Sequence, residues 1–201
     1  MAVVFYISGH GFGHASREIE IINAIFAQRP DAQVCVRTTA ARWLFERTLR
    51  GPARLERVVC DTGAVQRGAL DIDVTATIRE ASVFHAQPQA WIDEEARTLE
   101  ALRASVVVGD IPPLAFAAAA RAGVDSVAFS NFTWDWIYGG YEEAQRDAPW
   151  LVDRLRSWYA LADEAWRLPM CGGFEGMRVT ADLPLVARHA RHEPVAVRAR
   201  L

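Results

Sequence analysis

Lysine is missing from this 201-residue sequence, whose 22 basic side chains are all arginines. A P-loop needs a lysine that reaches the nucleotide phosphates, and a Schiff base needs a lysine amine. A P-loop, a Schiff-base enzyme and a catalytic ammonium group are therefore excluded from this segment.

Cysteine is scarce as well, and the three cysteines, Cys35, Cys60 and Cys171, lie far apart. The sequence contains no Cys-x-x-Cys pair and no Cys/His spacing suited to zinc. This usage is typical of buried or inert thiols in a reducing cytoplasm. We therefore expect a cytoplasmic protein that binds no metal.

The sequence also lacks a basic excess and a long apolar run. Its net charge of −3 provides no broad positive field, so nucleic acid is not expected as the main partner. A small anion can still bind at a local site. The apolar run at the N-terminus is too short for a membrane span and lacks the basic start of a signal peptide. We interpret it as a first β-strand and predict no transmembrane segment.

With 51% hydrophobic and 23% charged residues, the composition is that of a globular domain. Short apolar runs alternate with longer stretches of helical spacing, which is typical of a parallel sheet flanked by helices. The predicted fold class is α/β, with a Rossmann-like sheet. Strands are expected over 3–8, 33–38, 58–60, 106–109, 126–129 and 164–168. Helices are expected from Ser16 to Pro30, over 42–49 and 91–102, over the alanine-rich stretch that Pro112-Pro113 opens, and over 145–161.

The alternating pattern weakens toward the C-terminus, where residues 186–201 carry arginines and histidines without a core pattern. We predict one Rossmann-like domain over residues 1–185. The start of an interdomain linker is expected over residues 186–201, in a chain that continues in nature.

The sharpest motif is SGHGFGHASR at residues 8–17, between the first strand and the first helix. Its glycines allow a tight turn and a close approach to a ligand. The helix N-terminus that follows offers unpaired N–H groups and a positive partial charge, which suit phosphate or carboxylate. His14 can in addition exchange protons and is a candidate catalytic residue. The predicted substrate- or phosphate-binding residues of this motif are Gly9, His10, Gly11, Gly13 and Arg17.

A dinucleotide site is disfavoured, because His14 stands where the third glycine of G-x-G-x-x-G belongs. No acidic residue follows the second predicted strand, which ends in Arg37-Thr38-Thr39. A turn that only reverses the chain is the alternative reading of the motif.

Polar residues follow two later strands at the same predicted sheet edge. Asp110, before Pro112-Pro113, is a candidate general base or sugar ligand, and a helix N-cap is the alternative. After the next strand, aromatic, amide and carboxylate groups suit carbohydrate. Trp136 we interpret as a core or domain-interface residue. The predicted substrate-binding residues here are Asn131, Thr133, Trp134 and Asp135.

Three motifs together carry a family resemblance: GHGFGHASR (9–17), VGDIPP (108–113) and NFTWDWIY (131–138). They resemble a group of bacterial predicted glycosyltransferases and the N-terminal region of plant L-arabinokinases. More distantly, the first loop resembles the glycine loop of MurG-type transferases, from which it departs at His10-Gly11-Phe12.

The resemblance implies the N-terminal half of a GT-B fold, in which two Rossmann-like domains face each other across a cleft. In that fold the N-terminal domain mostly takes the acceptor, and the C-terminal domain takes the nucleotide sugar. Gly9, Gly11, Gly13 and His14 would then face the cleft. We predict transfer of a hexosyl-type group to a carbohydrate or lipid-linked acceptor, assisted by His14 or Asp110. No metal or other cofactor is implied, and the fragment is expected to be inactive without its C-terminal domain.

Two other functions fit the same motifs. One is a non-catalytic sugar-binding module, as the arabinokinase resemblance suggests. The other is a nucleotide-sugar epimerase on the same two-domain fold, which would need no acceptor.

Overall fold

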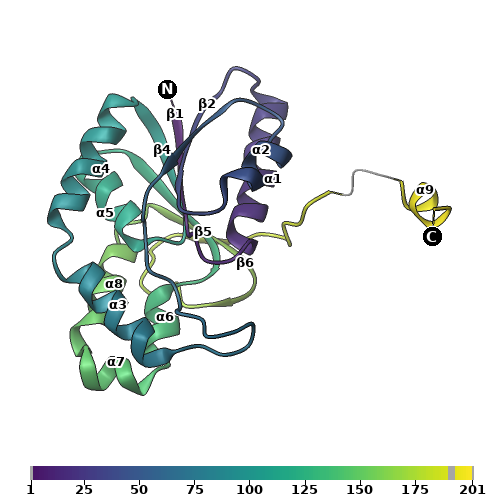
Figure 1. Cartoon of the computed structure of the whole chain (residues 1–201). Helices are drawn as coiled ribbons and strands as arrows, with labels where there is room; N and C mark the ends of the chain where they lie inside the picture. Colours follow the sequence, from purple (N-terminus) through teal and green to yellow (C-terminus); the bar gives the residue numbers. More distant parts are fainter. Residues whose placement is uncertain (1, 190–192, 201) are drawn as a thin grey trace.

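The computed structural model describes residues 2–189 and 193–200 and consists of a parallel sheet with helices on both faces (Figure 1). The sheet has seven strands in the order β3-β2-β1-β4-β5-β6-β7, and every neighbouring pair is parallel. The predicted α/β class with a Rossmann-like sheet is confirmed. The strands are β1 (Ala2–Ile7), β2 (Gln33–Thr38), β3 (Ala53–Arg57), β4 (Ala104–Asp110), β5 (Asp125–Phe132), β6 (Glu164–Gly172) and β7 (Thr180–Asp182).

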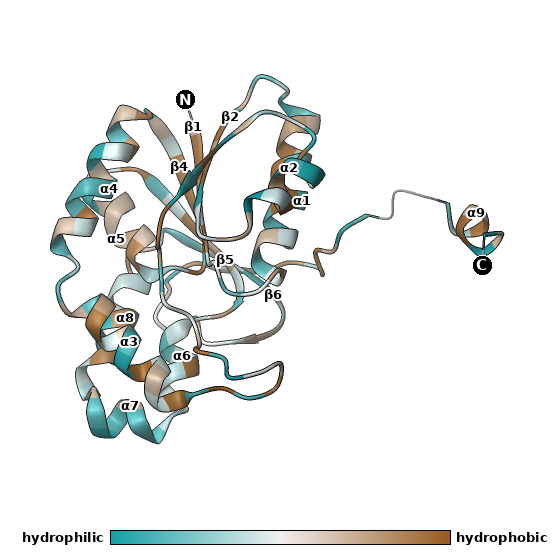
Figure 2. Ribbon diagram, in the orientation of Figure 1, coloured by the Kyte–Doolittle hydropathy of each residue, from teal (hydrophilic) through white to brown (hydrophobic). Residues whose placement is uncertain are grey.

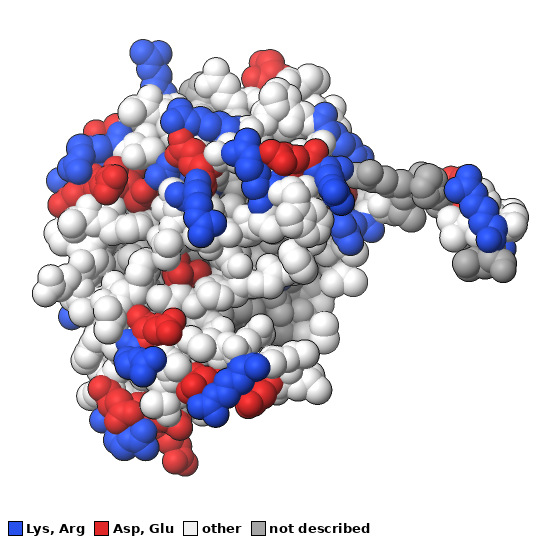
Figure 3. Space-filling view, in the orientation of Figure 1, with Lys and Arg blue, Asp and Glu red and all other residues white. Residues whose placement is uncertain are grey.

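The helices are α1 (Gly13–Gln28), α2 (Arg42–Thr48), α3 (Val74–Ala86), α4 (Gln89–Ala101), α5 (Pro113–Ala122), α6 (Trp134–Gly139), α7 (Glu142–Asp147), α8 (Pro149–Tyr159) and α9 (Pro194–Arg198). Among the described residues, no helix is long and apolar enough to cross a membrane. Figure 3 shows arginine and acidic groups interspersed on the face that it draws, without a field of one sign.

The apolar strands are buried because helices cover both faces of the sheet. On one face α1 and α2 pack on alternate strand residues such as Phe5, Ile7 and Val36. On the other face α5 packs on Val4 and Tyr6, and its alanines allow a close approach. Figure 2 shows β1 and β2 largely brown in the middle of the domain, whereas α4 and α7 at its outside carry much teal.

The strand order reverses direction between β1 and β4, which are hydrogen-bonded neighbours. In open parallel sheets, ligands bind outside the carboxyl ends of the strands at such a switch point. The residues that follow Ile7 and Asp110 therefore occupy the position where a ligand site is expected.

The third strand was predicted at the wrong place: it covers Ala53–Arg57, and residues 58–60 follow it without strand structure. β3 is an edge strand that pairs only with β2. Ala53 and Leu55 pack against the core, while Arg54 and Glu56 alternate with them. An edge strand with one covered face need not read as a continuous apolar run.

The first helix begins at Gly13 rather than at the predicted Ser16. Phe12 occupies the N-cap position, and no side chain caps the helix. The first-turn N–H groups of α1 thus keep no side-chain acceptor, which matters for the site described below.

The C-terminal part contains more elements than predicted. The stretch 145–161 divides into α7 and α8 at Ala148-Pro149, because proline starts a helix well but ends the preceding one. β6 extends to Gly172, and β7 was not anticipated. Residues 183–189 form no helix or strand, and α9 buries no residue. The predicted domain boundary near residue 185 stays a prediction.

One buried histidine makes the stability of this fold sensitive to acid. His85 on α3 is 1% exposed and packs against the rings of Phe84 and Trp158. Burial, with Arg154 nearby, lowers the pKa of His85 to about 3. In an unfolded chain histidine titrates near pH 6.5, so between about pH 6.5 and 3 the unfolded state binds the extra proton.

We therefore expect the free energy of unfolding to fall over that window by up to about 1.4 kcal/mol per pH unit. Replacing His85 by leucine should make this slope shallower in urea denaturation at pH 7 and pH 4. The control His189→Leu changes an exposed histidine and should keep the wild-type slope. Equal slopes for wild type and His85→Leu would contradict the prediction.

Candidate functional site

The glycine loop connects β1 to α1 at the switch point. Its glycines differ in what the absence of a side chain allows. A Cβ on Gly9 would lie 1.8 Å from Oγ1 of Thr39, so this glycine allows the loop that follows β2 to approach the glycine loop. Gly11 has φ +71°, a left-handed conformation that favours glycine. Around Gly13 the space is open. The missing side chains of Gly11 and of Gly13, the first residue of α1, both leave room for a ligand.

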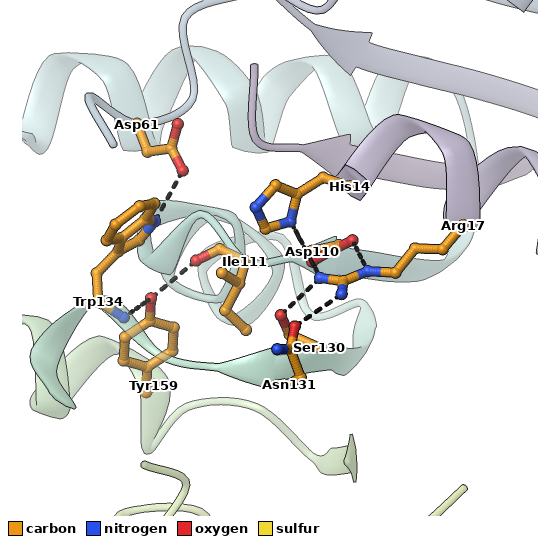
Figure 4. Close-up of polar contacts among 9 residues, drawn as sticks. All are labelled: His14, Arg17, Asp61, Asp110, Ile111, Ser130, Asn131, Trp134 and Tyr159. Carbon is orange, nitrogen blue, oxygen red and sulfur yellow. Dashed lines mark hydrogen bonds and ion pairs between the residues drawn. The ribbon is translucent and has the colours of Figure 1, made fainter. Parts of the chain in front are cut away.

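His14 and Asp110 meet at this edge from opposite sides of the switch point (Figure 4). Nδ1 of His14 lies 2.9 Å from Oδ1 of Asp110. Arg17, one turn along α1, holds the same carboxylate from the other side: its Nε donates to Oδ2 at 2.6 Å and its Nη2 to Oδ1 at 2.5 Å. The carboxylate is therefore shared between an imidazole and a guanidinium.

The contacts of Arg17 determine which tautomer His14 adopts. The two N–H groups on Nη2 are used by Asp110 and by Oγ of Ser130, at 2.9 Å from the latter. Nη2 also lies 3.0 Å from Nδ1 of His14 but has no proton left for it. Nδ1 facing a carboxylate at 2.9 Å must itself carry the proton. Nε2, which has no hydrogen-bond partner in the described part of the chain, is then the basic nitrogen.

Asp110 has no exposed surface, and its ionised form is held by its partners. Burial alone would raise the pKa of this carboxyl, but the charges and hydrogen bonds of His14 and Arg17 lower it well below its usual range. The alternative of a helix N-cap is wrong, because Pro112 occupies the N-cap of α5 without a side-chain bond. In this position Asp110 can orient His14 but cannot touch a substrate.

Arg17 was predicted to bind substrate or phosphate, and the structure engages its guanidinium within the protein. Besides Asp110 and Ser130, it contacts Asn131, whose Oδ1 accepts from Nη1 at 2.8 Å. Ser130 and Asn131 are among the last three residues of β5, so this one side chain joins the carboxyl ends of β4 and β5 to α1. Its side chain is 14% exposed. The arrangement gives Arg17 a positioning role.

A second cluster lies beside His14 and includes Asp61, which the sequence pattern did not single out. Oδ2 of Asp61 accepts from the indole N–H of Trp134 at 2.9 Å (Figure 4), and Oδ1 lies 3.7 Å from Nε2 of His10. The His10 ring fills the space where a Cβ on Gly63 would lie, and Gly63 has a φ of +59°. Burial raises the pKa of Asp61, whereas His10 and the hydrogen bonds to the carboxylate act in the opposite direction and lower it.

The NFTWDW segment is arranged differently from the prediction. Thr133 and Trp134 are at most 5% exposed, so they do not present their side chains to a ligand as predicted, whereas Asp135, also 5% exposed, borders the cavity beside α6. The backbone N–H of Trp134 donates to the hydroxyl of Tyr159, which in turn donates to the carbonyl of Ile111. By contrast, Trp136, interpreted as a core or domain-interface residue, is 51% exposed and is not in the core.

Sequence reasoning missed two buried acids close to His14 and Asp110. Asp61 directly follows the strand predicted over 58–60, so the rule that pointed to Asp110 would also have indicated it, even though β3 itself ends at Arg57. Glu18 on α1 is fully buried, and neither of its oxygens has a hydrogen-bond partner among the described residues. Burial, then the charge of Asp110, raises the pKa of Glu18 well above its usual value, so its neutral form is favoured.

Two sizeable cavities lie outside the cluster of His14 and Asp110. One of about 620 Å³ lies between α1, α2 and the C-terminal segment and is lined by Phe12, Trp43, Arg50 and others. Another, of about 570 Å³, lies beside α6. His14 is 8% exposed and lies at an open sheet edge. A reaction at this edge would be shielded from water only when another surface covers it. No group of three or more possible metal-ligating residues occurs in residues 2–189 and 193–200.

Comparison with known proteins gives one sequence relative. No protein-family model matches the chain. The chain is 33% identical over 207 residues to L-arabinokinase of Arabidopsis thaliana, covering 100% of this chain but 19% of that protein. The activity of the whole plant protein therefore does not transfer to this chain.

Comparison with solved structures shows the fold. The UGT2 protein of Phytolacca americana, in complex with UDP-2-fluoro-glucose and pterostilbene, matches 94% of this chain at 12% identity with a TM-score of 0.54. A UGT transferase from Siraitia grosvenorii, in complex with UDP, matches 83% at 16% identity with a TM-score of 0.50. The chain spans 55% and 44% of those two proteins. It has the architecture of one Rossmann-like half of a GT-B glycosyltransferase.

Proposed function

We infer that this chain, which has one Rossmann-like half of the GT-B fold, is the acceptor-side domain of a glycosyltransferase. The proposed enzyme is cytoplasmic, depends on a nucleotide sugar and uses no metal. The observation that carries this inference is the His14–Asp110 pair at the switch point of the sheet. A histidine whose Nδ1–H is held by a buried carboxylate presents a basic Nε2, as a general base requires.

In the proposed reaction, an acceptor hydroxyl gives its proton to Nε2 of His14. The acceptor oxygen forms a bond to the anomeric carbon of the donor sugar, and the bond from that carbon to the diphosphate oxygen breaks. The nucleoside diphosphate leaves with that electron pair. Asp110 stabilises the imidazolium that forms, since its carboxylate lies 2.9 Å from Nδ1 and stays ionised.

The uncapped start of α1 supports a role with phosphate. Because Phe12 provides no side-chain acceptor, the first-turn N–H groups are available to the negative charge that develops on the leaving diphosphate. The open space at Gly13 allows a phosphate to approach this helix end. Gly9, Gly11 and His10 shape the loop around it.

A second domain is part of this proposal. The two glycosyltransferases above are about twice as long as the matching part, and this chain's site lies at an open edge. We propose that a second Rossmann-like domain holds a UDP-sugar opposite His14. An acceptor and a donor can be aligned only when both walls of the cleft are present.

The similarity to L-arabinokinase favours a second candidate, a sugar-binding module without catalysis. This candidate uses the same edge to bind a sugar and predicts binding of L-arabinose without cleavage of any nucleotide sugar.

Calorimetric titration distinguishes the two candidates. UDP-glucose and UDP are titrated into this chain and into the natural protein that contains it, followed by an assay for released UDP. Donor binding that needs the longer protein, with UDP release on addition of an acceptor, supports the transferase. Binding of L-arabinose to this chain, with no nucleotide binding by either form, contradicts the transferase and supports the module.

A further inference from the structure

Trp136 is held in an exposed position by two glycines at the end of β6. It is 51% exposed, which is unusual for the largest aromatic side chain. A Cβ on Gly172 would lie 2.5 Å from its indole ring. Gly173 has φ +86°, and a Cβ there would lie 3.0 Å from Cβ of Trp136. The backbone of the strand end thus fixes the indole, while about half of the residue stays open.

The indole borders a cavity of about 570 Å³, within the roughly 300–1,000 Å³ range of small-molecule sites. Tyr141 and the exposed backbone of Gly139-Gly140 line it as well. Its charged groups form a pair: Nε of Arg156 lies 3.3 Å from Oδ2 of Asp135. The Asp135 side chain is 7% exposed and the Arg156 side chain 52%, so the guanidinium is anchored but still reaches solvent.

This combination suits a neutral sugar better than an anion. One carboxylate and one guanidinium leave the cavity without net charge, so a phosphate or carboxylate ligand has no excess positive charge to bind to. A fixed aromatic ring can stack on the C–H face of a sugar ring at little cost in side-chain entropy. Arg156, Tyr141 and the open backbone provide donors and acceptors for hydroxyl groups.

We propose that the cavity beside α6, with Trp136 as its stacking platform, binds a neutral sugar ring of the acceptor. This deepens and rests on the glycosyltransferase function proposed above, because it assigns the acceptor to carbohydrate. The cavity and His14 belong to adjoining segments of one sheet edge: the ring of Phe132 lies 5.5 Å from that of His14 and 5.1 Å from that of Trp134, which begins α6.

The test uses the indole N–H signals of the seven tryptophans in a nitrogen-15 NMR spectrum of this chain, with Trp136 assigned by Trp136→Phe. The probes are the methyl glycosides of glucose, galactose, xylose and L-arabinose, and sorbitol is the acyclic control. We expect at least one glycoside, and not sorbitol, to shift the Trp136 signal saturably. Trp136→Ala should weaken that binding at least about tenfold, equivalent to about 1.4 kcal/mol.

Two further variants separate stacking from folding. Gly172→Ala keeps the indole but displaces it, so it should weaken glycoside binding as well. The matched control Trp43→Ala removes another exposed tryptophan, on α2, and should bind as wild type does. Thermal unfolding of each variant shows whether the fold is kept. The proposal is overturned if no glycoside moves the Trp136 signal at tens of millimolar, or if Trp136→Ala binds like the wild type.

The outcomes also separate this subsite from the transferase. Glycoside binding at Trp136 needs no nucleotide-sugar donor, so it should be measurable in the absence of UDP-glucose. If glycosides bind at Trp136 but no transfer occurs with any of them, the transferase is wrong and the subsite stands. If transfer occurs while the Trp136 signal stays unmoved by the accepted sugar, the subsite is wrong and the transferase stands.

Discussion

Replacing His14 by alanine should slow sugar transfer by the natural protein roughly 10²- to 10⁴-fold, the range that a general base contributes. The acceptor hydroxyl would lose the proposed acceptor of its proton, and Asp110 could not replace it because Asp110 has no exposed surface. Donor binding should change little, since the proposed donor contacts are backbone groups. The measurement is the rate of UDP release at saturating donor and acceptor.

His189→Ala is the matched control, because it removes a largely exposed histidine of the C-terminal segment. Asp110→Asn gives a second check: it removes the charge that fixes the tautomer of His14 and should also lower the rate, with little change in shape. If His14→Ala keeps more than a tenth of the wild-type rate, another group is the base.

Replacing Arg17 by alanine should lower the free energy of unfolding by about 3–5 kcal/mol, as expected when a buried ion pair loses one partner. The Asp110 carboxylate would remain in a fully buried site without the guanidinium that donates to both of its oxygens. Arg17→Lys keeps the charge but lacks the planar fork, so an intermediate loss is expected. Urea denaturation at pH 7 measures these differences.

A double mutant provides the control for Arg17. Arg17→Met alone leaves the charge of Asp110 unpaired, whereas Arg17→Met with Asp110→Asn removes both charges. The double variant should therefore be more stable than the single one. A loss below 1 kcal/mol for Arg17→Ala, or strict additivity in the double variant, would show that the pair contributes little.

The sheet and its functional edge could be predicted because both follow from local patterns. Buried parallel strands read as apolar runs, and loops at their carboxyl ends meet at one edge. His14 and Asp110 were therefore placed at the same edge from sequence, and the structure brings them into contact. Their predicted roles depend on chemistry that only a functional assay tests.

The orientation of individual side chains could not be predicted in the same way. Residues two apart lie on one face of a strand but about 200° apart around a helix. The pattern did not show that residues 134–139 form α6, so it could not separate the buried Trp134 from the exposed Trp136. Similarly, nothing local indicates that Arg17 is engaged by a carboxylate 93 residues away.

The contacts of Arg17 also determine when the site can exist during synthesis. Its partners lie 93 residues away at Asp110 and 113 and 114 residues away at Ser130 and Asn131. A nascent chain that has released only β1 and α1 carries His14 without the carboxylate that orients it. Contacts of such long range form late, after the closure of a large loop. A ribosome-bound chain would thus acquire its oriented base only once β4 has emerged and paired with β1, and the full set of Arg17 contacts only after β5 has joined them.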